Sequence, residues 1–221
     1  MPRSILPTCE TAVSTVPEWH RADLKGAEEK LVSPDGWSPG ALTLGQALAM
    51  KVHCPLLHAE INRLIIDLSR HPEDDERFSK LSARFTDDQR RKLDERQLAP
   101  YLSILRERIE TAKRRGQEAC HVSLDTRPGI APAWVIFEYD SSRIAEGAFV
   151  AEWKAAFLSK IPEAVVQERS SPTRSFAGYL RGEHPSGFCS VRLIAAQTSF
   201  LDGKPVGWSQ LRKALVDTVP R

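Results

Sequence analysis

Apolar and polar positions along the chain follow two periods, one typical of strands and one typical of helices. Strands are expected at Ser4–Cys9, Pro55–His58, Leu64–Leu68, Ala119–Leu124, Ala133–Tyr139, a short stretch near Val165, and Phe188–Ala196. Helices are expected at Ala41–Lys51, Leu98–Ala112 with Gly116 as the stop, about Arg143–Lys160, and about Ser209–Val219. Because strands alternate with helices, the pattern favours an α/β fold in which one sheet is covered by helices on both faces.

One segment departs from this alternation. Residues from Glu73 to Arg96 are crowded with charges of both signs and include few large apolar side chains. We interpret the stretch 73–97 as a solvated helical excursion from a single domain that spans residues 1–221. A contact surface for a partner is the alternative interpretation of the same charges.

Composition narrows the class of protein. The 221 residues suffice for one large α/β domain, and 31 basic residues are interleaved with 29 acidic ones to give a net charge of +2. This balance gives no indication of nucleic acid or an acidic membrane as a partner. With no long apolar run and no apolar N-terminal segment of the signal-peptide kind, the sequence predicts a cytoplasmic protein. The four cysteines are far apart without a Cys-x2-Cys pair, which predicts reduced thiols.

The stretch from Glu60 to His71 places Asn62, Arg63, Asp67 and Arg70 within an apolar run. A charge taken out of water costs several kcal/mol unless it meets a partner or a ligand. On a strand, Arg63 and Asp67 would share a face, and Arg70 would lie at or beyond the strand end. Two interpretations follow. Asp67 forms an internal ion pair with one arginine, or the group binds an anionic substrate through Asn62, Arg63 and Arg70, with Arg70 as the better candidate.

A second set of polar residues falls where strands are expected to end. Ligands of open α/β sheets bind beyond the carboxyl ends of the strands, which here points to Glu10, Thr11 and the run from His121 to Asp125. His121, Ser123 and Asp125 are two residues apart, so their side chains face one way on an extended strand. A histidine and an aspartate so placed can share a metal or transfer protons. Alternatively, His121 is a hydrogen-bonded strand histidine and Asp125 is a turn residue.

Taken in order, these residues resemble the N-formylglutamate amidohydrolase family. The resemblance rests on Thr8-Cys9-Glu10, Val16-Pro17, Gly40-Ala41, Arg63-Leu-Ile-Ile-Asp67-Leu-Ser-Arg70, Pro100-Tyr101, His121-Val-Ser123, Phe176-Ala-Gly178 and Gln197. It implies a three-layer α/β fold with a mixed central sheet, similar to that of zinc carboxypeptidases. It also implies cleavage of a formyl or related amide bond by a metal-activated water, with zinc as the cofactor and an N-acyl amino acid or another small carboxylate as the ligand.

The sequence departs from the family pattern at the positions where the resemblance places the chemistry, including a late-strand glutamate expected to act as a base or to orient the substrate. Thr11 stands in place of a metal-binding histidine, Ser38 lies nearest an expected aspartate, Asp125 replaces a second histidine, and Ile194 lies near an expected glutamate. A neutral hydroxyl is a poor zinc ligand. The metal candidates that remain are Glu10, His121 and Asp125, and Glu10 and His121 are also the catalytic candidates. A site without metal is the alternative.

Three hypotheses about function remain open. The chain is a divergent amidohydrolase that acts on an N-acyl amino acid or related amide, a non-catalytic relative that binds a small carboxylate, or an interaction module that retains only the fold.

Overall fold

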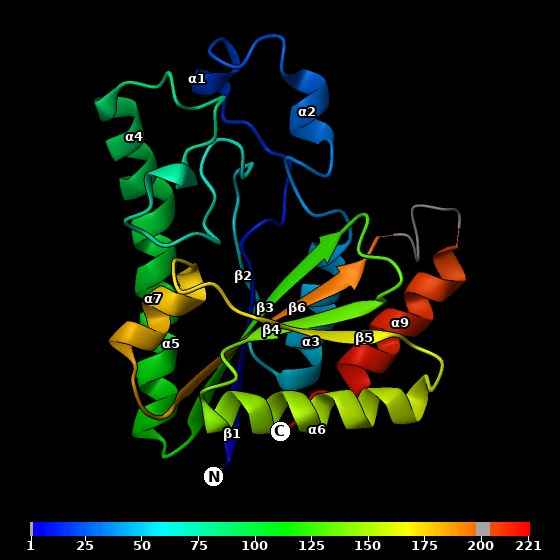
Figure 1. Ribbon diagram of the computed structural model, residues 1–221. Helices are drawn as coiled ribbons and strands as arrows, with labels where there is room; N and C mark the ends of the chain where they lie inside the picture. Colours follow the sequence, from blue (N-terminus) through cyan, green and yellow to red (C-terminus); the bar gives the residue numbers. More distant parts are fainter. Residues whose placement is uncertain (1, 198–203) are drawn as a thin grey trace.

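The computed structural model describes residues 2–197 and 204–221, and its centre is a six-stranded mixed sheet of order β2-β1-β3-β6-β4-β5 (Figure 1). The strands are β1 (Arg3–Cys9), β2 (Leu57–His58), β3 (Glu118–Arg127), β4 (Val135–Tyr139), β5 (Val166–Ser170) and β6 (Phe188–Ala196). The first three and β6 are parallel, whereas β4 runs antiparallel to β6 and parallel to β5. The predicted α/β class and mixed sheet are confirmed.

One face of the sheet packs on three long helices, α3 (Ala41–Val52), α6 (Ile144–Lys160) and α9 (Pro205–Asp217). Alternate residues of the central strands, including Val122 and Val191, point into this core, where Trp153 is 1% exposed. Each helix contributes apolar side chains at helical spacing, such as Phe149, Trp153 and Phe157 of α6. This face is apolar from Cys120 to Leu124 of β3 and from Cys189 to Ala195 of β6.

The opposite face is covered by α5 (Ala99–Arg114) and α7 (Phe176–Glu183). Near the amino ends of the strands this face is apolar too, because Leu6, Ala119 and Phe188 join the cluster that holds Leu105 and Ile109 of α5. Helices therefore lie on both faces, as predicted. The N-cap of α7 is Ser175, whose hydroxyl accepts a hydrogen bond from the N–H of Gly178 at 3.0 Å.

The loops that follow β1 and β2 form the upper part of the molecule in Figure 1, beyond the carboxyl ends of the parallel strands. This part contains the short helices α1 (Glu18–Arg21) and α2 (Glu28–Val32), the turn η1 (Asp75–Arg77), and α4 (Asp87–Leu93), which continues through the π-helical turn η2 (Asp94–Leu98) into α5. Within the described ranges, no helix is long and apolar enough to cross a membrane.

Two predicted elements differ in the structure. The stretch Leu64–Leu68 is a series of turns and not a strand, with bonds such as Ile65 N–H to Asn62 C=O at 2.9 Å. Its apolar side chains are buried because the loop itself packs into the core, where Ile65 and Ile66 are fully buried. Apart from the single 3-10 turn η1, the charged segment is helical only from Asp87 onward. Before that residue it folds as turns that bury Phe78 and Phe85.

Candidate site at the carboxyl ends of the strands

The register of the sheet aligns polar residues on the face that carries α5 and α7. Thr8 of β1 pairs with Ser123 of β3, which pairs with Arg192 of β6, and Arg192 in turn opposes Glu138 of β4. Paired residues on neighbouring strands point to the same face of a sheet. Ser123, one of the three β3 residues predicted to share a face, is therefore part of a polar row that crosses four strands.

Three of the positions that depart from the family pattern lie in contact with one another. The Thr11 hydroxyl lies 2.8 Å from the Ser38 hydroxyl and donates to Asp125 Oδ1 at 3.2 Å. The Ser38 hydroxyl donates to the same carboxylate oxygen in a short hydrogen bond. All three residues are buried, with exposed fractions of 2% or less. Residues far apart in the sequence thus form one cluster.

The carboxylate of Asp125 is paired with arginines. Arg192 Nη2 donates to Asp125 Oδ2 at 2.6 Å, and Arg127 Nε donates to the same oxygen at 2.9 Å. Burial alone would raise the pKa of Asp125, but Arg192, Arg127 and the Ser38 hydroxyl outweigh it and hold the pKa well below its ordinary value. Both oxygens of Asp125 are therefore engaged by donors of the chain.

Glu10 lies just past the end of β1 in a separate buried network. Its carboxylate accepts from the Tyr101 hydroxyl at 2.9 Å and from the Ser123 hydroxyl at 2.5 Å, and His121 Nε2 lies 3.7 Å away. Burial raises the pKa of this carboxyl, yet His121, with the hydroxyls of Ser123 and Thr8, more than compensates and lowers the pKa of Glu10 to about 2. Glu10 is accordingly an ionised, fully hydrogen-bonded group.

Both ring nitrogens of His121 are occupied by hydroxyl groups. Nε2 lies 2.8 Å from the Thr8 hydroxyl and Nδ1 lies 2.8 Å from the Ser190 hydroxyl. The ring lies between Phe176, in an edge contact, and Phe188, in a stacked one. Of the two interpretations of His121, this environment matches the hydrogen-bonded strand histidine.

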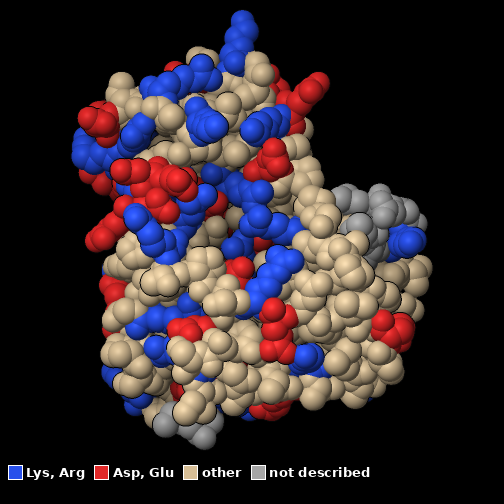
Figure 2. Space-filling model, in the orientation of Figure 1, with Lys and Arg blue, Asp and Glu red and all other residues tan. Residues whose placement is uncertain are grey.

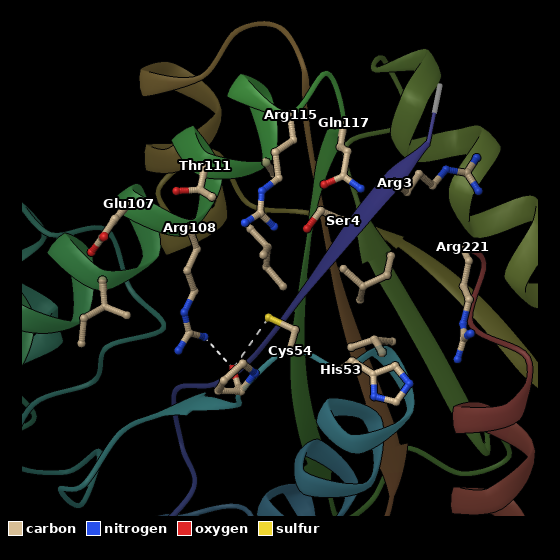
Figure 3. A pocket seen from close by; sticks show the side chains of 16 residues that line it. Arg3, Ser4, His53, Cys54, Glu107, Arg108, Thr111, Arg115, Gln117 and Arg221 are labelled. Carbon is tan, nitrogen blue, oxygen red and sulfur yellow. Dashed lines mark hydrogen bonds between the residues drawn. The ribbon is translucent and has the colours of Figure 1, made fainter.

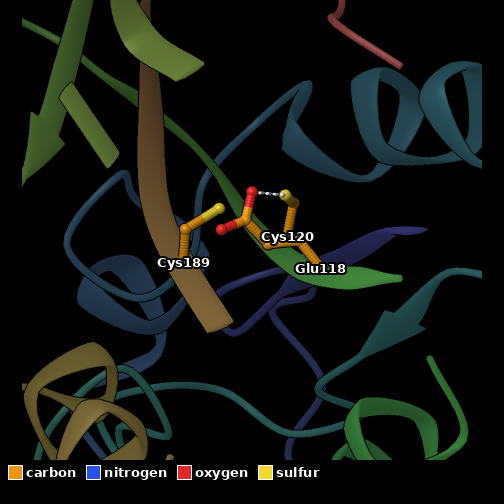
Figure 4. A group of neighbouring side chains, drawn as sticks. All are labelled: Glu118, Cys120 and Cys189. Carbon is orange, nitrogen blue, oxygen red and sulfur yellow. Dashed lines mark hydrogen bonds between the residues drawn. The ribbon is translucent and has the colours of Figure 1, made fainter. Parts of the chain in front are cut away.

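The donor set does not fit zinc. Among the described residues, the side-chain ligand atoms of Glu10, His121 and Asp125 do not form a group within metal-binding distance of one another. The residues that do surround Asp125 are two neutral hydroxyls and two guanidinium groups, which are poor or repulsive partners for a cation. The one group of metal-ligand type in the described chain is Glu118, Cys120 and Cys189, near the amino ends of β3 and β6 (Figure 4).

Asn62 and Arg63 act on loops and not on the cavity. The Asn62 side-chain amide donates to Leu31 C=O at 2.7 Å, and its oxygen accepts from the Leu64 N–H at 2.9 Å. Arg63 donates through Nε to Asp35 C=O at 2.6 Å and through Nη2 to Pro34 C=O at 2.8 Å. These contacts hold the loop between α2 and α3, and the predicted role of both residues in substrate binding stays a prediction.

Arg70, the stronger candidate for substrate binding, is paired with acidic residues, and its predicted role stays a prediction. Its guanidinium pairs with Glu76 at 2.8 Å and with Asp74 at 3.4 Å, so its charge is taken up by acidic residues of the following loop. Asp67 pairs with neither arginine in a salt bridge, and its carboxylate instead accepts from the N–H and hydroxyl of Ser69. The backbone of Arg70 bridges Ser175 at the rim of the cavity, but the side chain turns away.

A small cavity of about 20 Å³ lies among Glu10, His121, Ser123 and Arg192, with Phe176 and several serines completing its wall. This volume accommodates roughly one water-sized group. Arg192 Nε is buried there without a hydrogen-bond partner among the described residues. Arg63, Arg127 and Arg192 interact electrostatically, which is consistent with the basic side chains that gather in the central hollow of Figure 2.

Arg192 is a candidate site residue that sequence reasoning does not single out. The signal was present, because Arg192 is the one charged residue in the otherwise apolar and small-residue strand β6. The second overlooked group is the buried pair of Glu146 and Arg181, whose Nε and Oε1 atoms lie 2.8 Å apart. Glu146 also accepts from the N–H of Ser190, so this pair supports the residue that contacts His121.

Comparison with solved structures identifies the fold. A gene product of Agrobacterium tumefaciens has a TM-score of 0.77 at 17% identity, covering 98% of this chain and 89% of its own. An N-formylglutamate amidohydrolase from Ralstonia eutropha has a TM-score of 0.71 at 15% identity, covering 99% of this chain and 92% of its own. The chain has the N-formylglutamate amidohydrolase fold. The fold implied by the sequence resemblance is thereby confirmed, whereas at these identities the likeness says nothing about activity.

Other comparisons add little to this amidohydrolase fold. A metallo-carboxypeptidase from Burkholderia cenocepacia has a TM-score of only 0.45 at 13% identity, covering 99% of this chain and 56% of its own, and supports no argument. No family model matches the sequence, and no curated protein matches it.

Proposed function

We propose that the protein is a non-catalytic member of the amidohydrolase fold that binds a small carboxylate at the carboxyl ends of β3 and β6. One observation carries this proposal: Thr11, Ser38 and Asp125 meet where the resemblance places metal ligands, and the Arg192 guanidinium is paired with that carboxylate. A cation attached to the chain thus lies where the resemblance implies a metal ion. Binding of an anion needs such a charge, whereas activation of water needs an open metal position.

The ligand is recognised by Arg192 and Arg127. Arg192 Nε supplies a buried donor without a partner, and the Arg127 side chain is 40% exposed, so its remaining donors face outward. Among the serines of the cavity wall, Ser171 accepts a hydrogen bond from Arg181 Nη1 at 3.1 Å and keeps its own O–H as a neutral donor. A planar carboxylate matches the fork of donors that arginine offers.

The cavity volume limits the ligand. About 20 Å³ has room for roughly one water-sized group, such as a single oxygen atom of a carboxylate, and not for the body of an N-acyl amino acid. We therefore expect formate and acetate to bind more readily than N-formylglutamate, whose larger body would have to displace the loop that carries Ser171 and Ser175.

A thermal shift titration tests the proposal. Sodium formate or acetate should raise the melting temperature of the wild type by a few degrees, about 2–4 °C for each kcal/mol of binding free energy, relative to sodium chloride at the same ionic strength. The rise should be lost in Arg127→Ala and kept in Arg70→Ala. Arg70 is the matched control because it is an arginine at the cavity rim whose charge is paired elsewhere.

The opposing outcome is equally measurable. Stoichiometric zinc in purified protein by elemental analysis, together with hydrolysis of N-formylglutamate, would overturn the proposal in favour of the hydrolase. The inherited geometry has its own test, in which Thr11→His, Ser38→Asp and Asp125→His are combined with Arg192→Met. Zinc binding by this variant is expected, and a folded variant that binds none would show that these positions do not correspond to family ligands.

A further inference from the structure

A larger groove lies at the opposite end of the sheet, along the outer edge of β1. Its volume is about 580 Å³, within the range of ligand sites. Strand β1 forms its floor, α5 forms one wall, and the turn after α3, with His53 and Cys54, forms the other (Figure 3). Nothing in the candidate carboxylate site contributes to this groove, so the two are separate.

The edge of β1 in this groove is unpaired by any strand of the described chain. Strand β2 pairs only with Thr8 and Cys9, which leaves Arg3 to Pro7 without a neighbour on that side. Pro7 explains the boundary, because proline offers no N–H to continue a ladder. A strand edge of this kind is a template for another extended segment.

The direction of the free backbone groups follows from the ladder. Pro2 C=O accepts from Glu118 of β3, whereas Cys9 C=O accepts from Ala59 on the β2 side, each at 2.9 Å. Alternate residues of a parallel strand address the same neighbour, so odd-numbered residues of β1 face away from β3. The N–H and C=O groups of Arg3 and Ile5 therefore point toward the groove.

The charges on the walls of the groove indicate which kind of extended segment it can bind. Arg108 and Arg115 project from α5 toward the groove, and the lining holds a single acidic residue, Glu107 (Figure 3). Arg108 is fixed by a hydrogen bond to Pro55 C=O at 2.6 Å, and Arg115 has no side-chain partner among the described residues. Arg3 differs, because Glu152 neutralises it at 2.6 Å.

We propose that this groove binds an extended acidic peptide segment, which adds to the edge of β1 as a further strand. The backbone of Arg3 and Ile5 supplies the ladder, and Arg108 and Arg115 pair with acidic side chains on the face turned toward α5. On β1 itself the charge of Arg3 is neutralised and Pro7 lies next to the pairing with β2, so neither blocks the edge between them. The unpaired charge comes from the neighbouring helix and faces the space that a new strand would occupy.

Fluorescence anisotropy with a short, labelled peptide of alternating Glu and Val measures the binding. The peptide should bind saturably and more weakly as salt rises, and a matched Lys and Val peptide should not bind. Methylation of alternate backbone nitrogens on the Glu and Val peptide should weaken binding about tenfold or more, because it removes ladder donors. Equal binding of the methylated peptide would overturn strand addition.

Charge reversal locates the site. Arg115→Glu should weaken binding about fivefold or more, and the fold should be unaffected because this side chain has no partner. Arg114→Glu is the matched control, since Arg114 lies on the same helix outside the groove lining and should retain wild-type affinity. Equal weakening by both variants would contradict the proposed site.

Hydrogen exchange and thiol labelling give direct readouts. Bound peptide should slow exchange of the Ile5 amide hydrogen and alkylation of Cys54, which is half-buried whereas the other three cysteines are buried. Binding that leaves the exchange of the Ile5 amide unchanged would place the peptide elsewhere and refute the proposal.

Discussion

Arginine side chains at the two ends of the sheet differ in their partners and in the open volume beside them. At the carboxyl ends, Arg192 and Arg127 are bound to Asp125, and the space beside them is about 20 Å³. At the amino end of β1, Arg115 has no partner among the described residues and faces a groove of about 580 Å³. A paired arginine holds the structure together and offers a ligand only its remaining donors, such as Arg192 Nε, whereas a free arginine beside open volume offers its whole guanidinium group. The comparison teaches that stability and binding share the same arginines at the carboxyl ends, whereas at the amino end of β1 an arginine is available for binding alone.

The largest expected effect comes from breaking the pair at the carboxyl ends. Asp125→Ala should lower the free energy of unfolding by about 3 kcal/mol or more, because it leaves Arg192 buried without its partner. Urea unfolding measures the loss. Adding Arg192→Met should restore part of it, and a double variant no more stable than Asp125→Ala would argue that the pair is not the source of the effect.

Lowering the pH should weaken the second buried network at the carboxyl ends of the strands, which is centred on Glu10. The pKa of Glu10 is lowered from 4.5 to about 2 in the folded chain, so its stabilising effect is complete above about pH 4.5 and is lost as pH falls toward 2. The loss amounts to roughly 3 kcal/mol. Glu10→Gln should show a smaller fall in unfolding free energy over this window. If the unfolding free energy of Glu10→Gln falls with pH as steeply as that of the wild type, protonation of Glu10 is not the cause of the loss.

A smaller effect is expected at the rim of the cavity. Arg70→Ala should cost less than about 1 kcal/mol of unfolding free energy, because its ion pairs with Glu76 and Asp74 are partly exposed. The measurement is the urea midpoint of the variant against wild type. A cost near that of Asp125→Ala would remove the distinction between rim and interior.

The smallest effect is expected at the groove. Arg115→Ala should change the unfolding free energy by less than about 0.5 kcal/mol, since no interaction within the described chain is lost. Thermal unfolding without peptide checks this value. A clear destabilisation would show that Arg115 supports the fold and would weaken its assignment to a ligand.

The periodicity of the sequence predicts most of the strands and helices, and it fails where apolar residues are buried without forming hydrogen bonds to a neighbouring strand. Leu64–Leu68 is as apolar as a buried strand, and a short apolar run does not distinguish a strand from a loop that packs into the core. The contact of Thr11, Ser38 and Asp125 agrees with the resemblance, which had related these positions to metal ligands. The pairing of Arg70 with Glu76 lay beyond sequence reasoning because it depends on how the following loop turns back.

Attachment of the positive charge to β6 has a consequence for the cell chemistry around this fold. A metal ion can be withdrawn by a chelator, exchanged for a competing ion, or lacking when supply is low. The guanidinium of Arg192 is made with the chain, and its pKa is raised further by Asp125 despite the opposing effect of burial. The positive charge that Arg192 brings to this end of the sheet is therefore fixed at synthesis.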